Sequence, residues 1–184
     1  MGESMKNIFI GLLFIFLNFD LNLGNMKIGL LPDFVGYFLM IKGFDELIKE
    51  SEFFDKVRPW AAFMTCYTGI IYVLEFLGAS NLLQGFSIIL GIISMCISLF
   101  ILYQIVSGVI DMEKKYQITI EGEKLKSLWT FMAISNVVVY ILIFINVFAV
   151  FLAIILLIVH IIFLFAFNNT KNLYYMERDK FFHN

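Results

Sequence analysis

Charged residues are scarce in this chain. Only 15% of its 184 residues are charged, whereas 61% are hydrophobic and phenylalanine alone contributes 22. Soluble domains carry about a quarter charged residues. A soluble domain of this size could not bury so much apolar surface, because the surface of a small protein is large relative to its volume. We therefore expect lipid to be the solvent for most of the chain.

The number of cysteines and the net charge are also low, and each excludes a class of protein. The two cysteines, Cys66 and Cys96, lie inside apolar runs, so a disulfide framework is not expected, and their spacing fits no metal motif. A net charge of −2 offers no basic surface for nucleic acid. We expect no metal, no cofactor and no nucleic-acid partner.

Catalytic signatures are missing as well. The sequence contains no H-E-x-x-H zinc motif, no G-x-S-x-G nucleophile elbow and no glycine-rich phosphate loop. His160 is the one histidine within an apolar run, since His183 lies near the C-terminus. The first apolar run is followed by "DLNLGNM", which lacks a small-x-small cleavage site. We expect neither an enzyme nor a removable signal peptide.

Long apolar runs dominate what is present. No Asp, Glu, Lys or Arg occurs between Lys126 and Lys171, or between Glu75 and Asp111. A bilayer-spanning helix needs about 20 apolar residues. The pattern predicts an all-α integral membrane protein, a six-transmembrane-helix bundle forming one domain over residues 1–184, with a cytoplasmic tail at 168–184. The expected helices lie near Lys6–Phe19, Pro32–Ile48, Pro59–Leu77, Leu82–Ile110, Ser127–Ile145 and Val147–Phe167.

Two of these boundaries have alternatives. The turn at Asn146 rests on one polar residue, and without it the last two segments would form one helix of about 40 residues, twice the length a bilayer needs. The first segment is short, so it either spans with local thinning of the bilayer or forms a re-entrant hairpin with the second segment.

Positive charge predicts the orientation. Lys and Arg gather in cytoplasmic loops. With six spans, twelve of the 13 basic residues fall on the side of the two termini, and Lys27 alone falls on the other. Trp60 and Trp129 would each begin a helix at the inner interface, where indole rings are favoured. We expect a plasma-membrane protein with both termini in the cytoplasm.

A proline and an aspartate stand together in the run "GLLPDFVGYFLMIKGFDEL". Proline suits the first helical turn, where its missing N–H costs nothing, and an acid there meets the positive end of the helix dipole. This interpretation makes Leu31 the N-cap of a helix, with Pro32 and Asp33 as its first residues. Pro59 begins the third helix by the same argument. The alternative is that Asp33 is an outward-facing functional acid.

Polar residues within the apolar segments are the candidate functional groups. His160 and Gln104 fall at similar depth in the inner half of the membrane, and one polar layer is expected there from four helices: Thr65, Thr68, Gln104, Ser135, Asn136 and His160. The layer is either a hydrogen-bonded core that fixes helix register, or a proton-sensitive or substrate-binding site.

The outer side collects acids, namely Asp20, Asp33 and Glu75. They are either separate interfacial carboxylates or a cluster between the first three helices. Tyr37 follows Asp33 by one helical turn, so it lies on the same helix face and is positioned to hydrogen-bond this acid.

Small residues predict where helices approach closely. They recur at steps of three and four in the fourth segment, which puts them on one helix face: Ser87, Gly91, Ser94 and Ser98. Gly36 and Gly43 make a shorter stripe in the second segment. The first stripe is a candidate surface for a membrane-protein partner or a second copy of the chain.

The runs "LLPDFVGYFLMIKGFDEL" and "SEFFDKVRPWA" resemble small, uncharacterised multi-pass membrane proteins of Clostridium-like Firmicutes that carry an L-L-P-D-F-[IV]-G-Y pattern. The resemblance covers residues 29–62 best, and later segments are similar only in hydropathy. It implies a bacterial plasma membrane and assigns no activity to its motif residues.

Two functions remain from the sequence. The first is an accessory, sensing or scaffold subunit of the membrane without catalytic activity. The second is a small-solute or ion transporter or channel that uses the polar layer around His160 and Gln104. The candidate functional polar residues are Asp33, Tyr37, Glu75, Gln104 and His160.

Overall fold

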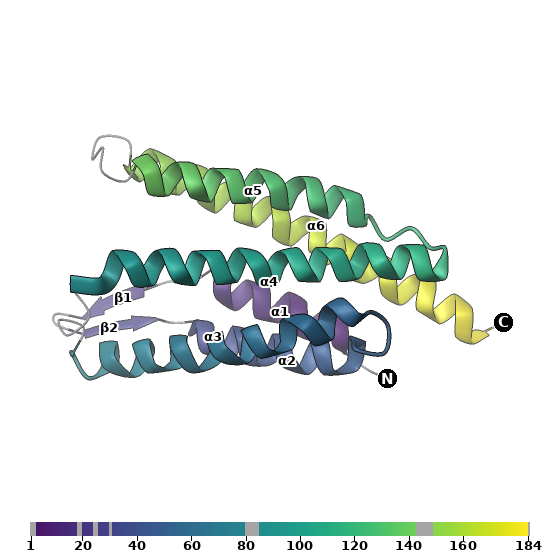
Figure 1. The fold of residues 1–184 in the computed structure, drawn as a ribbon, viewed down its shortest axis with the longest axis horizontal. Helices are drawn as coiled ribbons and strands as arrows, with labels where there is room; N and C mark the ends of the chain where they lie inside the picture. The colour runs from purple at the N-terminus through teal and green to yellow at the C-terminus, as the bar shows by residue number, and fades with distance from the viewer. Residues whose placement is uncertain are drawn as a thin grey trace.

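The computed structural model describes residues 3–17, 20–23, 26–29, 31–79, 85–142 and 149–183. Over these residues the chain forms six helices and one short antiparallel β-hairpin (Figure 1). In chain order the elements are α1 (Ser4–Phe16), β1 (Asp20–Leu23), β2 (Met26–Gly29), α2 (Asp33–Leu47), α3 (Glu52–Phe76), α4 (Ser87–Tyr116), α5 (Gly122–Leu142) and α6 (Ala149–His183).

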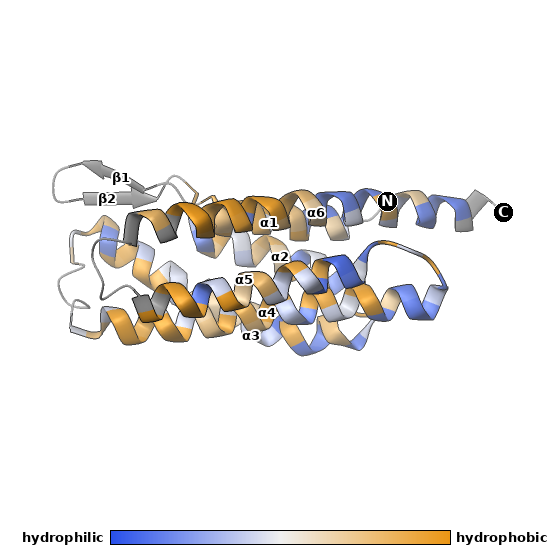
Figure 2. Ribbon diagram, turned by 90° about the horizontal axis from the view of Figure 1, so that it is seen from above, coloured by the Kyte–Doolittle hydropathy of each residue, from blue (hydrophilic) through white to orange (hydrophobic). Residues whose placement is uncertain are grey.

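The helices form a closed ring. Each packs against the next along the chain, and α6 returns to pack against α1. Both termini therefore lie at the same end of the bundle, which we call the terminus end; the opposite end, where the hairpin lies, is the far end (Figure 1). Hydrophilic residues gather at the terminus end and hydrophobic residues extend from there to the far end (Figure 2).

Backbone contact through glycines joins α1 to α2. A Cβ atom on Gly11 would lie 2.5 Å from the carbonyl oxygen of Gly36, and a Cβ on Gly36 would lie 2.7 Å from that of Gly11. Two helical turns further along α2, a Cβ on Gly43 would lie 2.6 Å from the carbonyl oxygen of Ser4. Small residues thus let the two backbones touch, as in tightly packed membrane helices.

The helix predicted to start at the Pro-Asp pair does start there. Pro32 is its N-cap, with φ −66° and ψ 128°, and Asp33 is its first residue, one position later than expected. The amide of Val35 donates to the carbonyl of Pro32 at 3.0 Å, which closes the first turn. Asp33 therefore sits where the helix dipole favours a negative charge.

The third helix begins earlier than predicted. It starts at Glu52 after the N-cap Ser51, so Pro59 lies inside the helix rather than at its start. Trp60 and Trp129 likewise lie well within α3 and α5 instead of beginning them. An interior proline removes one backbone hydrogen bond. The buried residues on either side of it, Val57 and Ala61, hold α3 continuous against the core.

The last three helices also differ from their predicted bounds. α4 runs on to Tyr116, and α6 continues to His183, so the expected tail at 168–184 is helical as far as it is described. α5 and α6 are separate helices that pack side by side, instead of one long helix. The turn predicted at Asn146 lies outside the described residues.

The hairpin makes the fold differ from a purely helical one. β1 and β2 pair in an antiparallel register, and Asp20 stands opposite Gly29. The sequence did carry a signal for it: two short alternating runs, "DLNL" and "MKIG", are separated by Gly24-Asn25, a dipeptide typical of tight hairpin turns. The expected first helix, near Lys6–Phe19, ends at Phe16.

The core is concentrated toward the terminus end. Four phenylalanines are fully buried there: Phe44, Phe54, Phe163 and Phe167. Among the described side chains, those buried in α3 end at Met64 and those buried in α4 begin at Ile101. Toward the far end, both helices therefore expose apolar side chains.

Among the described residues, two helical stretches are long and apolar enough to cross a membrane. They are Ser87–Tyr116, whose most apolar 18-residue window has a mean hydropathy of 2.4, and Ile154–Lys180, whose window has 1.9. Only 22% and 33% of their most apolar windows are buried inside the protein, unlike the core helix of a soluble protein. The prediction of a membrane protein is supported to this extent.

The α1–α2 contact gives a stability prediction. Gly36→Ala would force the new Cβ against backbone, which cannot rotate away, and we expect a loss of about 1–3 kcal/mol. Gly69→Ala is the matched control, because its Cβ would meet Phe34 at an ordinary 3.7 Å; alanine there gains up to about 1 kcal/mol of helix propensity. Thermal unfolding in detergent compares the two. Equal stability of both variants would contradict the backbone contact.

Candidate functional site

Most polar side chains of the predicted layer form hydrogen bonds within their own helices. Five of its side chains hydrogen-bond the carbonyl four residues earlier in their own helix, at 2.7–2.9 Å: Thr65, Thr68, Ser135, Asn136 and His160. This local bond satisfies a polar group within an apolar environment. These bonds do not link one helix to another, so they do not form the expected network between helices.

His160 and Gln104 belong to helices that are not neighbours in the ring. α4 packs against α3 and α5, whereas α6 packs against α5 and α1. The Nδ1 of His160 lies 2.7 Å from the carbonyl of Leu156, and since a carbonyl only accepts, Nδ1 carries the proton. The imidazole ring also packs against the ring of Phe16 in a T-shaped arrangement, with the ring centroids 4.4 Å apart. His160 therefore joins α6 to α1, while Gln104 is buried on α4.

Tyr37 makes a hydrogen bond that links α2 to α4. Its hydroxyl lies 2.7 Å from the Oγ of Ser98, which in turn donates to the carbonyl of Ser94 at 2.8 Å. Because the single Ser98 proton is used in that second bond, Tyr37 must be the donor in the first. The predicted bond from Tyr37 to Asp33 is replaced by this contact between α2 and α4.

The Ser98 contact also changes the interpretation of the small-residue stripe on α4. Ser98 lies against Tyr37 of the same chain, and the carbonyl of Leu90, next to Gly91, accepts a hydrogen bond from Tyr67 at 3.2 Å. The stripe is therefore in contact within the chain at Ser98 and beside Gly91. Its use as a surface for a membrane-protein partner or a second copy of the chain stays a prediction.

The outer acids all belong to elements at the far end. Asp20 begins β1, Asp33 begins α2, and Glu75 lies in the last turn of α3. Phe34 and Tyr72 join α2 to α3 in this region, with ring centroids 5.5 Å apart. The sequence thus placed the acids at one end of the molecule.

The terminus end holds a set of polar contacts that the sequence analysis missed. The Ser51 hydroxyl donates to Asp111 at 2.6 Å, joining the α2–α3 turn to α4. The Lys115 ammonium donates to the backbone carbonyls of Lys49 and Glu50 at 3.2 and 2.9 Å, and Tyr116 bonds the Glu50 carboxylate. These two carbonyls belong to the turn that follows α2, so the Lys115 ammonium fixes this turn against the end of α4.

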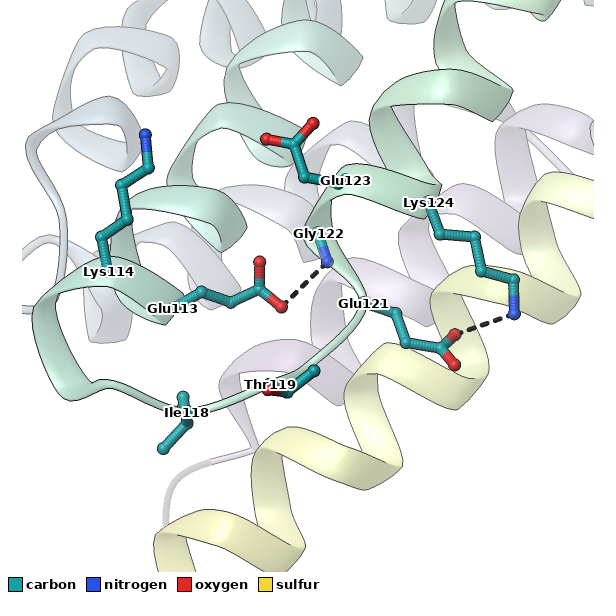
Figure 3. A pocket seen from close by; sticks show the side chains of 8 residues that line it. All are labelled: Glu113, Lys114, Ile118, Thr119, Glu121, Gly122, Glu123 and Lys124. Atoms are coloured by element: carbon teal, nitrogen blue, oxygen red, sulfur yellow. Dashed lines mark hydrogen bonds and ion pairs between the residues drawn. The ribbon is translucent and has the colours of Figure 1, made fainter.

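Glu113 organises the next loop, between α4 and α5 (Figure 3). Its Oε1 accepts hydrogen bonds from the amides of Ile120 and Gly122, at 2.7 and 3.1 Å. Gln117 and Glu121 have φ values of 54° and 66°, in the left-handed region. Non-glycine residues adopt this region at a cost, so the Glu113 carboxylate holds a loop that would otherwise relax.

An open depression of about 490 Å³ lies beside this loop, lined by Glu113, Lys114, Ile118, Thr119, Glu121, Gly122, Glu123 and Lys124 (Figure 3). Two of its charged side chains, Lys124 and Glu121, form an ion pair. Lys124 lies 2.9 Å from Glu121, and hydrogen bonds from Lys124 and Asn169 hold the pKa of the Glu121 carboxyl below its usual value. Within the described ranges, no cluster of His, Cys, Asp and Glu residues is suited to a metal ion.

A third set of contacts joins α6 to the start of α1. The backbone amide of Lys6 donates to the Tyr175 hydroxyl at 3.2 Å, and the Lys171 ammonium stacks on the ring of Phe9 at 4.6 Å. Arg178 lies 4.8 Å from the ring of Tyr175. These contacts close the ring of helices at the terminus end.

Comparison of the chain with known protein families, with curated proteins and with solved structures finds no match.

The Tyr37–Ser98 bond gives a second prediction. Tyr37→Phe removes the donor, and Ser98→Ala leaves a buried tyrosine hydroxyl without its acceptor, so Ser98→Ala should cost more, about 1–3 kcal/mol. In a double-mutant cycle measured by unfolding in detergent, we expect a coupling energy of about 0.5–1.5 kcal/mol. Tyr103→Phe, on an exposed position of α4, is the control and should change stability little. If the stability losses of the two single mutants simply add up in the double mutant, the bond contributes nothing.

Proposed function

We propose that this protein is a plasma-membrane protein that crosses the bilayer six times, with both termini in the cytoplasm. The observation that carries the proposal is the exposure of apolar side chains on the outside of the bundle. Ile70, Phe86 and Ile141 are 62%, 64% and 66% exposed. Soluble monomers rarely expose apolar patches larger than a few hundred Å².

Charge supports the proposed orientation. The basic residues other than Lys27 belong to the helix ends and loops at the terminus end of the bundle, or to the outer face of α2 near that end. Cytoplasmic loops collect such residues. Lys42, on α2, lies 4.8 Å from the ring of Phe38, which covers part of its charge in an apolar setting. The resemblance of residues 29–62 to clostridial membrane proteins supports a bacterial plasma membrane.

Aromatic residues support the position of the inner interface. Trp60 is 44% exposed and meets Phe100, while the indole N–H of Trp129 donates to the carbonyl of Leu99 at 3.0 Å. Indole rings with one polar contact prefer the headgroup level. The residues of α3 and α5 that precede these tryptophans then extend into the cytoplasm.

For its role, we propose an accessory, sensing or scaffold subunit without catalytic activity. The cytoplasmic half is packed with large apolar side chains, including Phe44, Phe54 and Phe163. Contacts at Asp111, at Glu113 and at Tyr175 tie its loops and helix ends together. Such a half is a rigid platform suited to presenting a fixed surface.

A transporter or channel is the second candidate. The observation that favours it is the contrast between the two halves, because α3 and α4 have their buried side chains only in the half near the termini. A carrier open to the outside would show the same contrast. His160 and Gln104 remain its candidate polar residues.

Cysteine labelling tests the topology. In a variant with Cys66→Ala and Cys96→Ala, a membrane-impermeant maleimide added to sealed cells should label Ala79→Cys. It should leave Thr119→Cys unlabelled, since this exposed residue belongs to the loop after α4, on the cytoplasmic side. Permeabilising the cells should make position 119 reactive. Labelling of Thr119→Cys from the outside of sealed cells would overturn the six-span orientation.

Flux measurements separate the two roles. The purified protein, reconstituted into liposomes with a pH-sensitive dye inside, should carry no more protons than empty liposomes, while a membrane-protein partner co-purifies from native membranes in mild detergent. A proton flux that falls at least tenfold in His160→Ala, with Thr130→Ala as an exposed control that leaves flux unchanged, would favour the transporter.

A further inference from the structure

The seam between α1 and α6 brings two lysines together at the terminus end. The Lys171 ammonium lies 4.6 Å from the centre of the Phe9 ring, and the backbone amide of Lys6 donates to the Tyr175 hydroxyl at 3.2 Å. The two helices are therefore antiparallel along the seam, since the earlier residue of α1 contacts the later residue of α6. This pairing puts Lys6 and Lys171 within about one helical turn of each other.

One face of α6 carries this charge on towards the end of the helix. Lys171, Tyr174, Tyr175 and Arg178 are spaced three, four and seven residues apart, so they share that face. The Arg178 guanidinium lies 5.6 Å and 4.8 Å from the centres of the Tyr174 and Tyr175 rings. Two cations and two tyrosines therefore stand beside the start of α1.

The positive charge on this face is not balanced by acids. Among the described residues, no ion pair includes Lys171 or Arg178, whereas six other basic side chains form ion pairs: Lys6, Lys56, Arg58, Lys124, Lys126 and Lys180. Lys171 donates instead to the neutral amide oxygen of Asn168, at 2.7 Å. Partial burial and the positive charge of Lys6 lower the pKa of the Lys171 ammonium. An anion placed between the two lysines would offset their repulsion.

The seam reaches this charge just beyond the apolar part of α6. Phe165, which is 73% exposed, lies six residues before Lys171, about 9 Å along the helix axis. Figure 2 shows α6 changing from hydrophobic to hydrophilic residues as it approaches the terminus end. A headgroup layer about 5–8 Å deep borders the hydrocarbon core on each side. With Phe165 in lipid, the Lys171 ammonium lies at the level of the phosphates.

The seam also offers hydrogen-bond donors that suit a phosphate. The Tyr175 oxygen accepts the Lys6 amide proton, and no described residue accepts the proton of its own hydroxyl, which is therefore available for donation. The ammonium groups of Lys6 and Lys171 supply further donors. Hydrogen bonds from cations to phosphate oxygens are stronger than those between neutral groups.

We propose that the α1–α6 seam binds an anionic phospholipid of the cytoplasmic leaflet, with the phosphate between Lys6 and Lys171. The acyl chains lie along the apolar surface beside the seam. Basic pockets between membrane helices on the cytoplasmic side bind such headgroups. The bound lipid joins the first helix of the ring to the last. The inference rests on the proposed membrane embedding and adds a specific lipid site to it.

Native mass spectrometry of the full-length, lipid-depleted protein in a neutral detergent tests the site by counting bound lipids. Phosphatidylglycerol should bind at least tenfold more tightly than phosphatidylcholine, whose headgroup has no net charge. Lys171→Gln should reduce this preference to threefold or less. Lys180→Gln is the matched control on the same helix and should keep the preference, because Lys180 is already paired with Glu177 at 2.6 Å. Lys6→Gln repeats the test if Lys171→Gln fails to fold.

Three outcomes would overturn the lipid site. The first is equal affinity of the wild-type protein for the two lipids. The second is an equal loss of preference in Lys180→Gln and Lys171→Gln, which would mean that the lipid responds to overall charge rather than to this seam. The third is displacement of phosphatidylglycerol by an equal concentration of inorganic phosphate, which would make the ligand a free anion.

Membrane embedding is tested separately in vesicles of pure phosphatidylcholine. The reconstituted wild-type protein should resist extraction by alkaline carbonate. Extraction would defeat the membrane proposal itself. Retention in the vesicles, together with equal affinity for the two lipids in detergent, would defeat only the lipid site.

Discussion

The contact between the backbones of α1 and α2 is the constraint on which the rest of the bundle depends. Gly11 and Gly36 bring the two helices so close that neither position has room for a Cβ atom. The pair then packs as a single thick element, with α3 on one side and α6 on the other. Two short helices can occupy places in a ring of much longer ones because this contact fixes them together.

The two halves of the molecule are stabilised by different forces. Near the termini, buried phenylalanines and bonds such as Ser51 to Asp111 hold helices and loops in one arrangement. At the far end, α3 and α4 have no buried side chains among those described, and their apolar residues are exposed. Apolar burial drives association in water, but lipid tails are as apolar as leucine, so the exposed half gains little from closing. The rigidity of the molecule is therefore concentrated where its loops meet water.

Patterns local in sequence predicted the fold best. Hydropathy predicted the six helices, and the Pro32-Asp33 pair predicted the start of α2 to within one residue. The start of α3 was mistaken because Pro59 was taken as a helix start; the acids Glu52 and Asp55 after Ser51 were the better signal. The hairpin was missed because eight residues of alternation are weak beside long apolar runs.

The candidate site was harder to predict, for a physical reason. Tyr37 and Ser98 are 61 residues apart in sequence, and the bond between them depends on how α2 and α4 pack. The polar layer around His160 was placed by depth alone, and depth says nothing about which helices are neighbours. Once the order of the ring is known, Gln104 and His160 fall on helices that are not neighbours in it.

The closed ring has a consequence for the order of assembly. Domains generally form as the chain is synthesised, beginning from the N-terminus. α1 is made first, yet one of its two neighbours, α6, is made last. Until residues near Tyr175 leave the ribosome, the amide of Lys6 and the ring of Phe16 lack the partners that they have in the finished protein. The ring of helices can therefore close only after α6 has been synthesised.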